Sequence, residues 1–204
     1  MTTEEQILIA ARKVFIQKGY DGARMQEIAN EAGINKALLH YYFRSKDKLF
    51  EQIFTESFQL IRPAFESALG TEPDIRSFLN LFVGGYLQLL EQLPYLPQFV
   101  IQELNRDPQR LVGLIGKQKI PIESIKIMIQ KEIDKGTLLP VSAEHLMVST
   151  IALIVFPFIA SPILKTVFFN QDQERYNHFI HERRDHIVNF VLGAITAPKR
   201  TQNE

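Results

Sequence analysis

The fold is decided by residues 25–43, which read MQEIANEAGINKALLHYYF. Ile28 and Leu39 each belong to an apolar face that repeats at helical spacing, so the stretch contains two short helices. Gly33 permits a sharp turn between them, and the side chain of Asn35 can cap the second helix. Two short helices that join at a tight turn through apolar inner faces form a helix-turn-helix.

The second helix of such a motif enters the DNA major groove, where its outward side chains reach phosphates and base edges. With Leu39 and Phe43 turned inward, the outward residues combine a cation with small, apolar, hydroxyl and imidazole side chains: Lys36, Ala37, Leu38, His40, Tyr41 and Tyr42. We expect these residues to face DNA. The alternative is that the tyrosines are ordinary core or surface aromatics and the lysines are merely solvated.

A first helix precedes the motif. Apolar residues recur at helical spacing over 7–15, Thr2 and Glu5 form a capping-box pattern, and Gly19 marks the end. Three helices within the first part of the chain indicate a small DNA-binding domain over residues 1–48.

Helical patterns continue to the end of the chain. Ser45 can cap a long fourth helix, in which Pro63 should cause a bend or a local break. Further stretches, separated by proline or glycine, cover about residues 74–91, 97–105, 122–135, 143–169 and 173–195. The sequence predicts an all-α fold of about nine helices, with a second domain over 49–197 and a frayed tail over 198–204.

Motifs at fixed spacing run through the N-terminal domain. They are Ile7 to Phe15, Lys18-Gly19-Tyr20, Ile28-Ala29, Ala32-Gly33-Ile34, Leu39, Tyr41-Tyr42-Phe43 and Lys46-Asp47-Lys48-Leu49. Together they resemble the DNA-binding domain of the TetR/AcrR family of transcriptional regulators. The resemblance implies a homodimer whose two recognition helices enter successive major grooves of a near-palindromic double-stranded operator.

The resemblance also implies roles for single residues. Lys36, Leu38, His40, Tyr41 and Tyr42 fall at DNA-facing positions, Lys48 and the amino end of the fourth helix would hold a phosphate, and Lys46 lies in the same basic cluster. Ala23 and Arg24 replace a common Thr or Ser pair, so we expect Arg24 to supply the phosphate contact that a lost cap weakens. Ala37 replaces a frequent Gly, and His40 replaces a usual Tyr.

The second domain has the side chains that a ligand cavity needs, although plain core packing is the favoured interpretation for any single one of them. The candidate lining residues are Phe58, Ile61, Phe65, Phe82, Tyr86, Phe99, Glu103, Met128 and Phe156. Such a lining suits a hydrophobic or aromatic small molecule. The resemblance implies a repressor that this ligand releases from its operator. The alternative function is a helical small-molecule-binding module that does not control DNA.

The last two helices are expected to form the dimer contact that the resemblance implies, through Phe156, Phe179, Ile187, Phe190 and Val191. Residues 146–164 carry no charge and are long enough to span a membrane. Pro157, Pro162 and several hydroxyl side chains interrupt this run, so we expect a buried helix and no membrane partner.

Composition and motifs argue against other classes. The 23 basic and 23 acidic residues cancel, there is no cysteine, and the acidic start lacks a signal-peptide pattern, so we expect a cytoplasmic protein. His178, His181 and His186 do not have the spacing of a zinc-protease helix, and Gly116-Lys117 lacks the other residues of a phosphate loop. We therefore expect no enzyme, no cofactor and no metal site.

Overall fold

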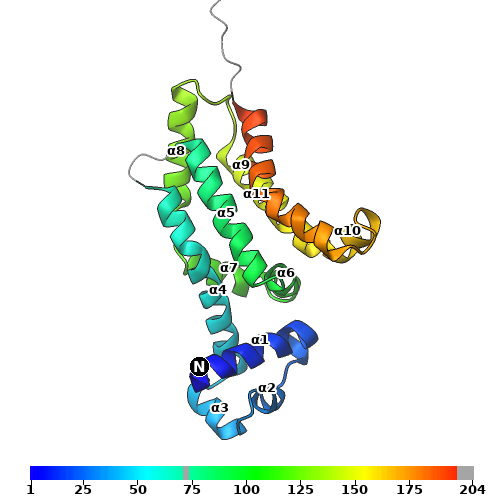
Figure 1. Ribbon diagram of the computed structural model, residues 1–204. Helices are drawn as coiled ribbons and strands as arrows, with labels where there is room; N and C mark the ends of the chain where they lie inside the picture. Colours follow the sequence, from blue (N-terminus) through cyan, green and yellow to red (C-terminus); the bar gives the residue numbers. More distant parts are fainter. Residues whose placement is uncertain (71–73, 197–204) are drawn as a thin grey trace, which may run out of the picture. The chain divides into compact units, whose positions relative to one another are not determined.

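The computed structural model describes residues 1–70 and 74–196, except for the side chains of Ile61, Ala64 and Phe65 (Figure 1). The described residues confirm the all-α prediction and contain eleven helices: α1 (Thr3–Gly22), α2 (Met25–Glu31), α3 (Lys36–Tyr42), α4 (Lys46–Ala68), α5 (Ile75–Gln92), α6 (Leu96–Arg106), α7 (Pro108–Gly116), α8 (Ile122–Asp134), α9 (Ala143–Ile159), α10 (Ser161–Val167) and α11 (Gln173–Ile195). The predicted tail, 198–204, lies outside the described residues.

The helices differ from the expected ones in three places. Helix α4 continues through Pro63 without a break. Helix α7 was not expected, although Asp107 caps it and Pro108 begins it, which is a recognised start signal. The predicted helix over 143–169 ends at Ile159, and a separate short helix follows.

The described chain forms two compact units. The first, here called the N-terminal unit, joins residues 1–60 with residues 93–120, and the second, the C-terminal unit, joins residues 61–92 with residues from 121 onward. Helices α6 and α7 therefore belong to the same unit as the helix-turn-helix, and within this unit α6 packs on α1. This division describes packing, and the predicted division of function at residue 48 stays a prediction.

Aromatic residues from distant parts of the sequence form the core of the N-terminal unit. The ring of Phe50 stacks on that of Phe99 with centroids 4.6 Å apart, and Phe15 meets Phe50 edge-on at 5.7 Å. All three side chains are buried. Phe99 was predicted to line a ligand cavity. Its ring belongs to this core, and its contribution to a cavity stays a prediction.

Helices α5, α9 and α11 pack together in the C-terminal unit, and α8 joins them. Phe82 and Met128 are buried there, as are Ile187 and Val191 of α11. Ile187 is 0% exposed, so burial within its own unit leaves neither α11 residue available to a partner chain. These two residues were predicted to form the dimer contact, and the structure corrects that prediction.

Pro157 lies inside α9, close to the end of the helix at Ile159. A proline has no N–H, so the carbonyl of Leu153, four residues earlier, loses its helical partner. Arg183 of α11 supplies a replacement, because its Nη2 donates to this carbonyl at 2.8 Å. The Tyr176 hydroxyl donates to the carbonyl of Pro157 itself, also at 2.8 Å. Two side chains of α11 thus satisfy backbone acceptors that the end of α9 exposes.

None of the described helices is by itself long and apolar enough to cross a membrane; α9 and α10 qualify only when taken together, as a pair bent by 72°.

Candidate nucleic-acid interface

The turn between α2 and α3 has the geometry of a helix-turn-helix. Gly33 has a φ of +67°, a left-handed conformation that side chains disfavour, and the N–H of Ile34 donates back to the carbonyl of Ala29 at 3.0 Å. Asn35 caps α3, because its Oδ1 accepts from the N–H of Leu38 at 2.8 Å. The short turn and the cap fix the direction of α3.

Helix α3 divides into a buried and an exposed face. Leu39 is fully buried, and Phe43, which follows the helix, is also in the core. The six residues predicted to face outward, Lys36, Ala37, Leu38, His40, Tyr41 and Tyr42, are all exposed. Tyr41 is 80% exposed and meets the ring of Tyr42 edge-on at 5.5 Å. A large solvated aromatic pair beside a lysine offers both hydroxyl donors and apolar area to a groove.

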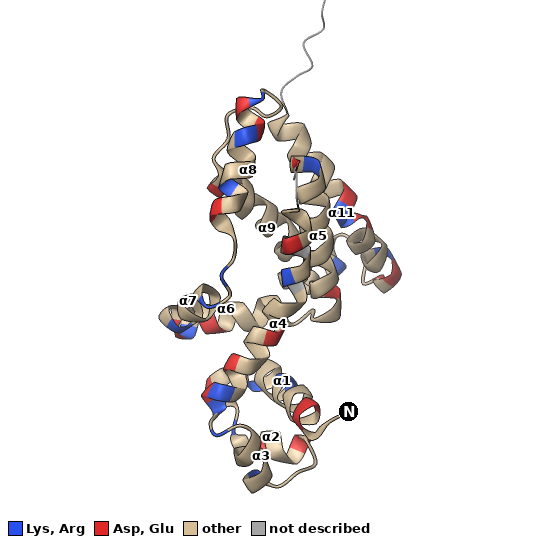
Figure 2. Ribbon diagram, turned by 90° about the vertical axis from the view of Figure 1, so that its left-hand side faces the viewer, with Lys and Arg blue, Asp and Glu red and all other residues tan. Residues whose placement is uncertain are grey.

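Three exposed cations border this face. Within the described part of the chain, Lys36, Arg24 and Arg44 form no ion pair with a carboxylate. Basic and acidic residues are otherwise interspersed in both units (Figure 2). Arg44 was not among the expected contacts, and it lies close behind α3 with an exposed side chain. Since its charge is solvated and adjacent to α3, it belongs to the candidate phosphate-binding set.

Lys48 lies in the first turn of α4. Its side chain is 68% exposed and pairs with Glu51 at 3.0 Å, while its N–H donates to the Ser45 hydroxyl at 3.2 Å. This ion pair lowers the pKa of Glu51. An exposed pair of this kind contributes little stability, so a phosphate can replace the carboxylate.

Lys46 has a different role from the one expected. Its Nζ donates to the carbonyls of Tyr20 and Ala23, at 2.7 and 3.1 Å, and lies 4.3 Å from the centroid of the Tyr20 ring. The ammonium group therefore holds the start of α4 against the end of α1. We remove Lys46 from the set of DNA contacts.

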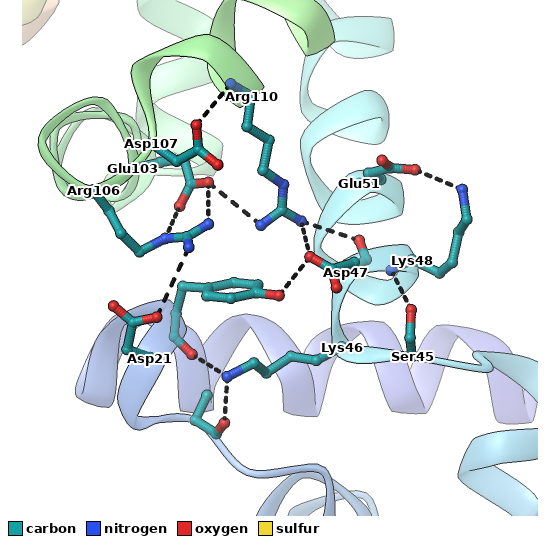
Figure 3. A network of polar contacts seen from close by, with 12 residues as sticks. Asp21, Ser45, Lys46, Asp47, Lys48, Glu51, Glu103, Arg106, Asp107 and Arg110 are labelled. Atoms are coloured by element: carbon teal, nitrogen blue, oxygen red, sulfur yellow. Dashed lines mark hydrogen bonds and ion pairs between the residues drawn. The ribbon is translucent and has the colours of Figure 1, made fainter.

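A polar network lies beside Lys46 (Figure 3). Glu103 of α6 accepts two hydrogen bonds from Arg106, at 2.6 and 2.9 Å, and one from Arg110 at 3.4 Å. The Glu103 side chain is 1% exposed, and its hydrogen bonds raise the pKa of Arg106. Glu103 was expected to line a ligand cavity. Its carboxylate is engaged in this network, and its place in the lining of a cavity stays a prediction.

The other predicted cavity residues divide between the units. Phe58 lies half-buried against Phe54 in the N-terminal unit. In the C-terminal unit, half-buried Tyr86 stacks on Phe82 with centroids 5.9 Å apart, and burial raises its pKa. Phe156 is 60% exposed, which contradicts a role inside a cavity of this unit. The side chains of Ile61 and Phe65 lie outside the described part.

The histidines of α11 pair with carboxylates. His178 lies 3.2 Å from Glu182, and His181 lies 3.6 Å from Glu91 of α5. Across the described residues, no three or more His, Asp or Glu side chains gather as a metal site would require.

Comparison with known proteins places this geometry in a family. Residues 7–53 match the sequence model "Bacterial regulatory proteins, tetR family". The chain is 25% identical over 180 residues to the "Probable HTH-type transcriptional regulator YttP" of Bacillus subtilis, covering 86% of each chain. It is 27% identical over 192 residues to the HTH-type transcriptional regulator RutR of Escherichia coli, covering 88% of this chain and 89% of that one.

A solved structure shares the fold. The ketosteroid transcriptional regulator KstR2 of Mycobacterium tuberculosis superposes with a TM-score of 0.74 at 14% identity, covering 97% of this chain and 96% of that one. The exposed α3, the matched N-terminal segment and full-length relatives that are themselves regulators agree with one another. Residues 7–53 therefore carry the DNA-binding region of the tetR family of bacterial regulatory proteins, and the chain is a DNA-binding transcriptional regulator.

Proposed function

We propose that this chain is a homodimeric repressor, which binds a near-palindromic operator and leaves it when a hydrophobic or aromatic small molecule binds. The observation that carries the proposal is the exposed face of α3, where Lys36, Tyr41 and Tyr42 project beyond a buried Leu39. A helix with this division can enter the major groove while its inner face stays in the core.

The contacts divide by chemistry. Lys36, His40, Tyr41 and Tyr42 present donors and acceptors to base edges, and Ala37 and Leu38 offer apolar contact to thymine methyl groups. Arg24, Arg44 and Lys48 lie around α3 as exposed cations, which suits phosphates. Phosphate contacts position the protein, and base contacts determine the sequence that it prefers.

Dimerisation is supported by an exposed apolar surface on the last three helices. Phe156 of α9 and Phe190 of α11 are each 60% exposed, although Phe side chains normally avoid water. Other exposed apolar residues of these helices are Val148, Ile151, Ile163, Val167 and Phe168. A symmetric partner that covers this surface would place two copies of α3 on one operator.

Effector binding belongs, in this proposal, to the domain over residues 49–197, while residues 1–48 read DNA. Phe82, Tyr86 and Met128 of the C-terminal unit provide apolar area and one hydroxyl. If the effector prefers a conformation that DNA disfavours, each ligand weakens the other by the same factor. A difference of about 1.4 kcal/mol changes the affinity tenfold. We further propose a cytoplasmic protein without catalytic activity.

Selection of DNA from a random duplex pool tests the regulator. We expect the purified chain to enrich two inverted half-sites whose centres lie about one helical turn apart. Binding to the selected duplex should weaken steeply with salt. A folded chain that enriches no sequence would contradict operator binding and would favour a small-molecule-binding module without DNA control.

A further inference from the structure

A salt-bridge network joins α7 to the DNA-facing end of α4 within the N-terminal unit. The guanidinium of Arg110 reaches the Asp47 carboxylate at 3.1 Å and the Asp47 carbonyl at 3.4 Å (Figure 3). The Tyr20 hydroxyl donates to the same carboxylate at 2.6 Å. Asp47 lies between Lys46 and Lys48, so these contacts hold the first turn of α4 from α7 on one side and from α1 on the other.

The network holds Arg110 in one position. Its guanidinium carbon lies 4.5 Å from the ring centroid of Phe50 and 4.7 Å from that of Tyr20, and its side chain is 14% exposed. Arg110 also donates to buried Glu103. An arginine that is held on its faces by aromatic rings and on its edges by two carboxylates has little freedom to reach a phosphate.

The charges around Tyr20 are balanced. Lys46, Arg106 and Arg110 lie within 5 Å of its ring, and the carboxylates of Asp21, Asp47 and Glu103 pair with the two arginines. Removing Arg110 leaves the Asp47 carboxylate, which is 62% exposed, without its cationic partner. A free carboxylate beside Lys48 repels a phosphate at the same end of α4.

We propose that Arg110 is a positioning residue for DNA binding, which fixes the first turn of α4 and neutralises Asp47 without touching DNA. The proposal rests on the DNA-binding function argued above. No sequence motif indicated Arg110, because its partner Asp47 lies 63 residues away along the chain.

A salt series on the duplex that the wild-type chain selects tests this role. We expect Arg110→Gln to weaken binding about tenfold, equivalent to about 1.4 kcal/mol, while the slope of log K against log salt stays unchanged. A residue that itself contacts a phosphate would instead reduce the slope by about 0.9. Arg62→Gln is the control, because Arg62 forms an exposed pair with Glu66 and should change neither quantity.

A double-mutant cycle separates positioning from a purely structural role. In an Asp47→Asn background, Arg110→Gln should cost much less DNA affinity than in the wild type, because the carboxylate that Arg110 neutralises is gone. Affinities are compared only between variants whose helical content and active fraction equal those of the wild type. If Arg110→Gln misfolds, Arg110→Lys replaces it as the test variant. Lysine keeps the positive charge but lacks the planar guanidinium group, so the salt slope should again stay unchanged and the loss of DNA affinity should be smaller.

Three results would each overturn the role proposed for Arg110. They are an unchanged DNA affinity in Arg110→Gln, a reduced salt slope in this variant, and additive effects of Arg110→Gln and Asp47→Asn. A wild-type chain that selects no duplex would instead contradict the operator binding on which this proposal depends.

Discussion

Lys36 and Lys46 show that the role of a lysine depends on which hydrogen-bond acceptors its ammonium group can reach. Both belong to one basic cluster in the sequence, and both were expected to contact DNA. Lys36 is exposed without an ion pair in the described chain, whereas the ammonium of Lys46 is held by two backbone carbonyls of the α1 end. Those acceptors lie more than 20 residues away, so no local pattern could have identified them.

Lys36→Met is expected to weaken binding to the selected duplex and to reduce the salt slope by about one phosphate contact if Lys36 lies on the backbone. A change of sequence preference with the slope unchanged would place Lys36 on a base edge instead. Filter binding across a salt series measures both.

Lys46→Met is the matched control from the same cluster. Because two part-buried carbonyls lose a charged donor, we expect its main effect to be a loss of unfolding free energy of roughly 1 to 3 kcal/mol. If the free energy of unfolding is unchanged and the salt dependence of DNA binding is reduced, Lys46 contacts DNA after all.

At the scale of elements, helix type and the helix-turn-helix could be predicted, but helix ends set by tertiary contacts could not. Thr2 and Glu5 form the expected capping box, with bonds of 2.7 and 3.2 Å. The end of α9 depends instead on Arg183 and Tyr176 of α11, which compensate for Pro157. Apolar spacing does not show which unit a residue such as Phe99 packs in.

Tyr176→Phe should reduce the free energy of unfolding by about 1 kcal/mol, because the carbonyl of Pro157 loses its donor. Urea unfolding measures the change. Tyr95→Phe is the matched control, since the Tyr95 hydroxyl is buried with no hydrogen-bond partner in the described chain. Loss of the Tyr95 hydroxyl should leave the free energy of unfolding equal to that of the wild type or higher. Equal losses in both variants would show that the Tyr176 bond contributes nothing specific.

The first turn of α9 should make stability depend on acid pH. Glu144 has its pKa lowered from 4.5 to about 2, first by its own backbone N–H and then by Lys126 and the Ser142 hydroxyl. A carboxylate with a lowered pKa stabilises the folded state fully above pH 4.5, and this contribution disappears as the pH falls towards 2.

Glu144→Gln should therefore be less stable than the wild type near pH 6, and the two should converge near pH 2. Urea titrations at a series of pH values test this. A stability difference that stays constant over the whole range would show that ionisation of Glu144 is not involved.

At the scale of the whole molecule, the proposed second copy of the chain would account for the apolar surface that a single chain leaves exposed. The sequence placed the dimer contact on the last two helices, but only the structure separates Ile187, which is core, from Phe190, which is solvated. Helical spacing alone cannot make this distinction on α11, because a helix that is buried on one side and paired on another is apolar around much of its circumference.

Phe190→Asp is expected to weaken the dimer, since it places a charge where a symmetric interface would have to bury it. Sedimentation equilibrium should show monomer at concentrations where the wild type is dimeric, with unchanged helical content. Val112→Asp is the control, because Val112 is similarly exposed, at 62%, but lies on α7 in the N-terminal unit.

The consequence for DNA follows from symmetry. A monomer loses the second half-site, so its affinity for the full palindrome should fall to that for a half-site. A Phe190→Asp chain that stays dimeric and binds the palindrome normally would move the interface away from this surface.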